Sequence, residues 1–191
     1  IFQVKRGIEE LLDIDFNTHS LYARKGLQKN SWGSSAMLIS CEQLRHWALD
    51  DLIDRLHLGK IDYDDLINLR LEEQPIGELE KKWNEFDEIN KNTILLHTTE
   101  KITQPWRAGL KLNSSIPPLL KFIPRAPLYK LFGKDLTLGR EHPHESISNF
   151  FFNELAECIA NNIVSTNELD DAIEKKYIRH DIYYKIRPFK T

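Results

Sequence analysis

Four prolines within the stretch 114–132 set the strongest limit on how this chain of 191 residues can fold. Proline lacks the backbone N–H that helices and central strands require, and its ring clashes with the preceding helical turn. The stretch is therefore predicted to be a linker or an arm, and it divides the chain into two parts of different character. The four residues are Pro117, Pro118, Pro124 and Pro127.

Before this arm, short apolar runs alternate with segments of helical period. Strands are predicted at 21–23, 35–40, 76–79 and 93–97. Helices are predicted at 8–12, 41–59 and 62–70. The continuous apolar run at 35–40 is typical of a buried strand, Gly59 is placed to end the second helix, and Asp62 is placed to cap the third. This alternation predicts an α/β fold.

After the arm, apolar residues return at helical spacing. The first set is Ile147, Phe150, Phe151, Leu155, Ile159 and Ile163. Proline is favoured near a helix start, so a helix is predicted from about Pro143 to Asn161. A second helical face is predicted from Leu169, Ile173 and Tyr177. The C-terminal quarter of the chain is therefore predicted to be helical.

Composition excludes several classes of protein. With 41% hydrophobic and 29% charged residues, the chain has the composition of a soluble globular protein. A formal net charge of -3 lacks the basic excess that tracks a phosphate backbone, which disfavours nucleic acid as a partner. No signal peptide opens the chain and no stretch approaches the ~20 apolar residues that span a bilayer, so a cytoplasmic location is expected. Cys41 and Cys158 are expected to be buried thiols.

A histidine closes the last predicted strand before the arm. His97 follows the apolar residues 93–96, and a side chain at the C-terminal end of a strand in an open α/β sheet faces the crevice where ligands bind. Imidazole is a common ligand of divalent metals. Two interpretations are open for His97 taken alone, a metal ligand or a structural histidine hydrogen-bonded in a loop.

The residues from His97 to Trp106 resemble part of the A-type-fold glycosyltransferases, in particular the family 8-like glycogenin and bacterial lipopolysaccharide galactosyl- and glucosyltransferase group. In that family a strand ends in a histidine that binds the metal, and a Lys-Pro-Trp element follows whose lysine contacts the donor diphosphate. His97 matches the histidine, and Pro105 and Trp106 match the end of the element. Gln104 replaces the lysine, so the resemblance implies donor contacts from Gln104, Trp106 and the neighbouring Arg107.

Upstream segments match the same family in order, so that the resemblance covers about residues 1–106. The small-residue run 34–39 resembles the strand whose start lies under the donor sugar, which implies a donor contact at Ser35. Trp83 and Asn84 resemble a Trp-Asn pair that precedes the histidine strand. Core packing is the alternative interpretation for Trp83.

A third match concerns two carboxylates. Asp62 and Asp64 resemble an Asp-Gln-Asp element near the transferred sugar, which implies catalytic roles for both. The alternative is that these residues cap a helix and complement its dipole in the first turn.

The family also uses an Asp-x-Asp pair to hold Mn²⁺ or Mg²⁺ against the donor diphosphate. Asp13 and Asp15 have the spacing of this pair. They follow the helix-like segment 8–12 instead of a hydrophobic strand, and are therefore interpreted as a chance match. By the resemblance, the genuine pair is expected before Ile1. The chain is therefore interpreted as a fragment of a longer protein.

The segment 107–140 is strongly basic. It contains seven Lys or Arg residues and a single Asp, interleaved with apolar residues. Such a segment could lie on an anionic membrane surface or hold a lipid-linked or phosphorylated acceptor. The alternative is an arm packed across the domain with its charged ends in water. His142 and His144 are assigned no role.

Together these features predict a glycosyltransferase that transfers a hexose from a nucleoside diphosphate sugar to a carbohydrate or lipid-linked acceptor, assisted by Mn²⁺ or Mg²⁺. The predicted organisation is 1–106 as the C-terminal part of the α/β domain, 107–140 as a basic arm, and 141–191 as a helical extension. The alternative is a non-catalytic module, derived from a truncated glycosyltransferase fold, that binds a partner or a membrane. A helix-rich nucleic-acid binder is disfavoured because the chain is acidic and lacks a groove-reading motif.

Overall fold

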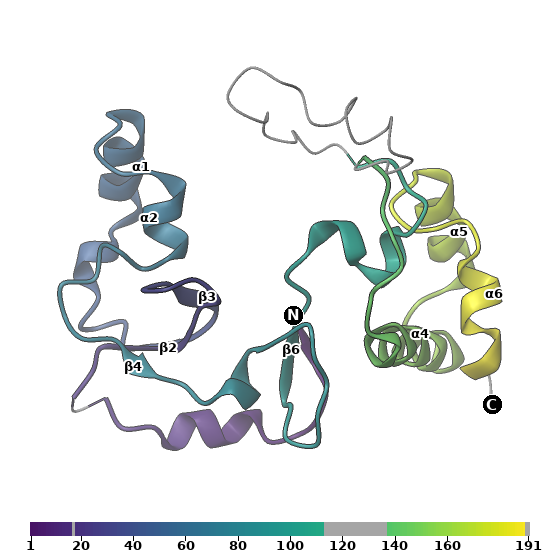
Figure 1. Ribbon diagram of the computed structural model, residues 1–191, viewed down its shortest axis with the longest axis horizontal. Helices are drawn as coiled ribbons and strands as arrows, with labels where there is room; N and C mark the ends of the chain where they lie inside the picture. The colour runs from purple at the N-terminus through teal and green to yellow at the C-terminus, as the bar shows by residue number, and fades with distance from the viewer. Residues whose placement is uncertain (17, 113–136, 190–191) are drawn as a thin grey trace. The chain divides into compact units, whose positions relative to one another are not determined.

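The computed structural model describes residues 1–16, 18–112 and 137–189. The chain divides into two compact units, Ile1–His97 and Thr98–Thr191. The described residues form a mixed α/β structure, with small sheets in the first unit and helices dominating the second (Figure 1). The three-part division made from the sequence stays a prediction.

The first unit contains two three-stranded sheets (Figure 1). One has the order β3-β2-β4, and its strands are Trp32–Ile39, Leu21–Lys25 and Gly77–Glu78. The other has the order β1-β6-β5, and its strands are Phe2–Gln3, Leu95–His97 and Glu85–Phe86. In each sheet the central strand has one antiparallel and one parallel neighbour. The four strands predicted from the sequence are confirmed as β2, β3, β4 and β6.

The predicted burial of the run 35–40 is wrong. β3 lies at the edge of its sheet and pairs only with β2, so its residues are half-buried or exposed. The pairing is also irregular. Ala23 pairs with Met37, yet the next residue, Arg24, pairs with Gly33, which leaves three residues of β3 outside the ladder. Ser35 is the middle residue of this bulge.

Helices of the first unit lie between these strands along the chain. They are the 3-10 helices η1 (Ile8–Asp13), η2 (Arg45–Trp47) and η3 (Lys81–Trp83) and the α-helices α1 (Leu49–His57) and α2 (Tyr63–Ile67). The single helix predicted at 41–59 is interrupted, because Ala48 has an extended backbone between η2 and α1. Cys41, just before η2, is exposed, so its predicted burial is wrong. Two apolar clusters form the core, one around Leu21 and Leu69 and one around Trp83 and Leu95.

The second unit is helical, as predicted from the spacing (Figure 1). Its elements are η4 (Lys101–Thr103), η5 (Pro105–Arg107), α4 (Glu145–Ala160), α5 (Thr166–Glu174), α6 (Ile182–Ile186) and η6 (Arg187–Phe189). Their shared core contains Phe152, Ala156, Leu169, Ile182 and Ile186. The predicted helix end near Asn161 is confirmed, because that residue caps α4. Tyr177, predicted on the face of the second helix, instead lies beyond α5 and is exposed.

Within the described residues, no helix combines the length and the apolar content needed to cross a membrane.

Candidate functional site

Two residues that were predicted separately as site residues contact each other in the first unit. His97, the last residue of β6, places its Nδ1 atom 2.7 Å from Oγ of Ser35 in the bulge of β3. The two residues are 62 positions apart in the sequence. The bulge makes this contact possible, because Ser35 is released from the ladder with β2 and can turn towards the neighbouring sheet.

A third residue of the resemblance completes the cluster. Asn84 is fully buried, and its Nδ2 atom lies 3.1 Å from Ser35 Oγ and 3.3 Å from the carbonyl oxygen of Gly33. Its Oδ1 atom is 3.2 Å from Ser35 Oγ and can accept the hydroxyl proton. With that proton directed to Asn84, Ser35 Oγ accepts from His97 Nδ1–H, and the lone pair of the imidazole lies on Nε2.

Gly33 allows the close approach of these groups. A Cβ atom at this position would lie 2.9 Å from Nδ2 of Asn84 and 2.9 Å from the ring of Phe86. Such distances are too short for carbon, so a larger residue would displace Asn84 or Phe86. The short side chain at position 33 therefore belongs to the construction of the site.

A buried ion pair between Arg24 and Glu85 lies next to the cluster and contacts the backbone of Asn84. Arg24 donates a hydrogen bond to the backbone oxygen of Asn84 and lies 3.3 Å from Glu85, and both side chains are almost completely buried. The guanidinium also lies over the ring of Phe86, 4.0 Å from its centroid. Burial lowers the pKa of Arg24, and the negative charge of Glu85 opposes that shift. This pair holds β5 next to β2 and fixes the backbone of Asn84.

His97 is neutral near pH 7. Its ring meets the edge of Phe86 with centroids 5.6 Å apart, and it is half-buried. Burial lowers the pKa of His97, whereas the carboxylate of Asp87 opposes the shift. A neutral imidazole with Nδ1 already engaged offers Nε2 as an acceptor or as a ligand atom.

The metal implied by the resemblance is not accounted for by this cluster. Mn²⁺ and Mg²⁺ take about six ligands, which are mostly oxygen atoms. Among residues 1–16, 18–112 and 137–189, no group of three or more His, Cys, Asp or Glu side chains could hold a metal ion. His97 supplies one nitrogen, so the described residues do not by themselves fit the ion.

Asp62 and Asp64 lie at the start of α2, in the same unit as His97. Asp62 caps the helix: its Oδ1 atom accepts from the Asp65 backbone N–H at 2.8 Å, and Asp65 Oδ2 accepts from the Asp62 backbone N–H at 3.0 Å. Asp64 is exposed in the first turn. No hydrogen bond or ion pair between described residues joins either carboxylate to Ser35 or His97, and their catalytic roles stay predictions.

Replacing Asp62 with alanine is expected to lower the free energy of unfolding by about 1 kcal/mol, because the cap is lost, while asparagine, an equally good cap, is expected to preserve it. Thermal denaturation of the three proteins measures the difference. Equal stabilities of the alanine and asparagine variants would contradict the capping role. Loss of donor turnover by Asp62→Asn at full stability would support the catalytic role implied by the resemblance.

The other predicted donor contacts lie in the second unit. Gln104 precedes η5, Pro105 is its buried first residue, and Trp106 packs on Phe151 of α4 with ring centroids 5.1 Å apart. Arg107 ends η5, and its Nε atom is buried without a hydrogen-bond partner among the described residues. Four of the seven basic residues predicted to form the arm, Lys121, Arg125, Lys130 and Lys134, lie outside the described residues.

Sequence reasoning missed the residue that organises the second unit. Arg179 is 4% exposed, and its guanidinium lies 2.7 Å from Glu141 Oε1 and 2.9 Å from Asp181 Oδ2. The guanidinium also donates to the carbonyl oxygen of Pro105 at 3.3 Å. The backbone N–H of Arg179 donates to the carbonyl oxygen of Trp106 at 2.8 Å. The partners are up to 74 positions away in the chain, so no local pattern could reveal them.

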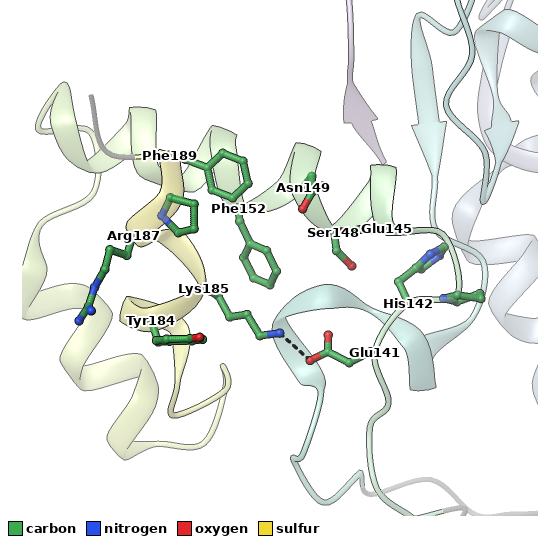
Figure 2. Close-up of a pocket in the computed structure, with 12 residues that line it drawn as sticks. Glu141, His142, Glu145, Ser148, Asn149, Phe152, Tyr184, Lys185, Arg187 and Phe189 are labelled. Carbon is green, nitrogen blue, oxygen red and sulfur yellow. Dashed lines mark ion pairs between the residues drawn. The ribbon is translucent and has the colours of Figure 1, made fainter.

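A second candidate site is a pocket of about 740 Å³ in this unit. Figure 2 shows Glu141 and His142 on one side and Phe152 and Phe189 on the other, with Lys185 directed towards Glu141. Lys185 Nζ lies 3.0 Å from Glu141, which also pairs with Arg179. Its lining carries two carboxylates, Glu141 and Glu145, and two cations, Lys185 and Arg187, so this pocket is a weaker candidate for a charged ligand than a site with uncompensated charge.

Comparison of the chain with family models, with curated proteins and with solved structures gives no match. The Ser35, Asn84 and His97 cluster and the basic end of η5 are therefore interpreted from their own chemistry and from the sequence resemblance.

Proposed function

We propose that the chain is part of a glycosyltransferase that transfers a hexose from a nucleoside diphosphate sugar to a carbohydrate or lipid-linked acceptor. One observation carries the proposal. Ser35, Asn84 and His97 were each singled out by a different segment of the resemblance, and they form one hydrogen-bonded cluster. The contact among three polar side chains that a single family pattern selects from separate segments supports a shared role for them.

The chemistry of the cluster suits this role. Glycosyl transfer requires stabilisation of the negative charge that develops on the departing diphosphate. A neutral His97, held at Nδ1 by Ser35, presents Nε2 to that group or to its counter-ion in a fixed orientation. Under the proposal, Gln104, Trp106 and Arg107 contact the donor, Asp62 and Asp64 lie near the transferred sugar, and 1–106 is part of an A-type glycosyltransferase domain.

A non-catalytic binding module is the second candidate, and one observation favours it. The Ser35, Asn84 and His97 cluster provides one imidazole, and the described residues contain no complete set of metal ligands. A protein that has kept the framework of the fold without the metal-binding carboxylates would bind a ligand or partner and leave it unchanged.

A donor screen distinguishes the two functions. The chain is incubated with a panel of nucleoside diphosphate hexoses, and release of the nucleoside diphosphate is followed with Mn²⁺, with Mg²⁺ and with a chelator. We expect release with at least one donor and its loss in chelator. Binding of a donor without release of the nucleoside diphosphate would support the non-catalytic module. Release that is unaffected by the chelator would contradict the role of His97 as a metal ligand.

A further inference from the structure

Five cationic side chains line one pocket of about 770 Å³ in the second unit. They are Lys101, Arg107, Lys111, Lys175 and Lys176. The pocket is also lined by Trp106 and Tyr177 and by three aliphatic residues, and no described carboxylate belongs to its lining. Cations gathered in a concave surface focus a positive potential that attracts anions.

The cations come from separate segments of the chain. Lys101 begins η4, Arg107 ends η5, and Lys111 lies in the bridge that pairs it with Leu138. Lys175 and Lys176 directly follow α5. The hydrogen bond from the Arg179 backbone N–H to the carbonyl oxygen of Trp106 joins η5 to the segment after α5. The fold therefore brings the charges together.

Helix capping explains only part of this arrangement. Lysines after a helix complement the negative end of its dipole, and Lys175 pairs with Asp171 at 2.8 Å. This accounts for Lys175 and Lys176. It does not account for the three cations contributed by η4, η5 and the Lys111 bridge, which raise the repulsion within the pocket.

Arg107 provides an independent sign of a ligand. Its Nε–H is buried and has no acceptor in the part of the chain that the structure describes. A buried donor without a partner is rare in folded proteins, since it loses its hydrogen bond to water without replacement. Guanidinium groups bind phosphate oxygens with matched geometry, and an oxyanion in the pocket would provide the missing acceptor once the Arg107 side chain turns its buried Nε–H towards it.

We propose that this pocket binds the phosphate or diphosphate group of a phosphate ester. Arg107 donates to the phosphate oxygens, and the lysines neutralise their charge. The exposed ring of Tyr177 and the ring of Trp106 border the pocket and offer apolar surface to the rest of the ligand. The pocket shares Trp106 and Arg107 with the proposed donor contacts, but binding of a phosphate group here is measured without donor turnover and can be tested separately from it.

The experiment measures binding of inorganic pyrophosphate to the whole chain by isothermal titration calorimetry at low and at physiological ionic strength. We expect saturable binding, weakened about tenfold or more in Arg107→Gln. Because Arg107 is partly buried, the double variant K111Q/K176Q, which changes only exposed side chains, is measured as well and is expected to show a similar loss. Circular dichroism confirms that each variant is folded.

Arg140→Gln is the matched control, since Arg140 is an exposed cation of the same unit outside the pocket. Its affinity for pyrophosphate is expected to remain unchanged. Absence of saturable binding by the unmodified chain, or an equal loss in the Arg140 variant, would overturn the proposal, whatever the result of the donor screen.

Two further arms identify the source of the phosphate. Displacement of pyrophosphate by a nucleoside diphosphate supports the site and indicates a soluble ligand. Sedimentation with vesicles that contain phosphatidic acid, lost in K111Q/K176Q and retained in the Arg140 variant, supports the site and indicates a lipid headgroup.

Discussion

Replacing Arg179 with methionine is expected to lower the free energy of unfolding of the second unit by about 3 kcal/mol. The guanidinium is buried and makes charged hydrogen bonds to Glu141 and Asp181, so its removal leaves Asp181 without this partner and leaves Glu141 with Lys185 alone. Loss of one member of a buried pair costs about 3–5 kcal/mol, and the lower end applies because the carboxylates are partly exposed. Hydrogen exchange of the α4 and α6 amides measures the change within this unit.

Two comparisons separate this network from a general effect of charge. Arg140→Met removes an exposed guanidinium from the same unit and is expected to leave exchange unchanged. The hydrogen bonds from Arg179 also hold the pKa values of Glu141 and Asp181 below their ordinary values.

Depressed carboxylate pKa values give the acid dependence a definite sign. The stabilisation is fully present above the unfolded pKa values of about 4, and it is lost as pH falls through the lower folded values. We therefore expect the protection of α4 and α6 to fall below about pH 4 in the unmodified chain. The same fall should be smaller in Arg179→Met, and identical acid profiles for the two proteins would contradict the assigned network.

Replacing His97 with alanine is expected to lower kcat/KM for the donor found in the screen by about 100-fold or more. Under the proposed function, the substitution removes Nε2, the atom offered to the departing diphosphate, and the loss of one preorganised contact of this kind costs about 10²–10³ in rate. Initial rates of nucleoside diphosphate release give the value. His57→Ala, which removes an exposed histidine at the end of α1, is the control and is expected to retain the unmodified rate.

Under the proposed function, Ser35 acts on the reaction through His97 and is a positioning residue. Ser35→Ala removes the acceptor of the Nδ1 proton and is expected to lower kcat/KM by about 10–100-fold. Ser35→Thr keeps the hydroxyl and suits a strand, so it is expected to restore most of the rate. Equal losses in the alanine and threonine variants would show that the hydroxyl does not orient the histidine.

Local sequence patterns predicted which segments form helices and strands better than they predicted how deeply these elements are buried. Four of the six strands before the arm, the capped helix α2 and the C-terminal helices follow from apolar spacing, from Asp62 and from Pro143, whereas β1 and β5 were not predicted. Burial was predicted less well, because it depends on partners far away in the sequence. The continuous apolar run of β3 is typical of a central strand, whereas the strand order of the sheet places β3 at its edge.

In the candidate site, too, local patterns identified residues but not the long-range contacts between them. Ser35, Asn84 and His97 were selected by the resemblance, but the contact that unites them requires the bulge, which no periodicity announces. Arg24 and Glu85 escaped notice because a buried ion pair between distant residues leaves no local signature. The pocket cations Lys175 and Lys176 read as helix-end residues, and their proximity to Arg107 is a product of tertiary structure.

The bulge of β3 also assigns two tasks to different residues of one strand, namely pairing with β2 and contact with His97. The paired residues on either side of it hold β3 to β2, whereas the three residues between them make no ladder contacts with that strand. Substitution within the bulge can therefore alter the surroundings of His97 while the pairing that stabilises the sheet is conserved. Under the proposed function, ligand preference can therefore change during evolution at Ser34 and Ser35 while the sheet pairing is kept, whereas Ala36 also packs against the core around Trp83 and Leu95.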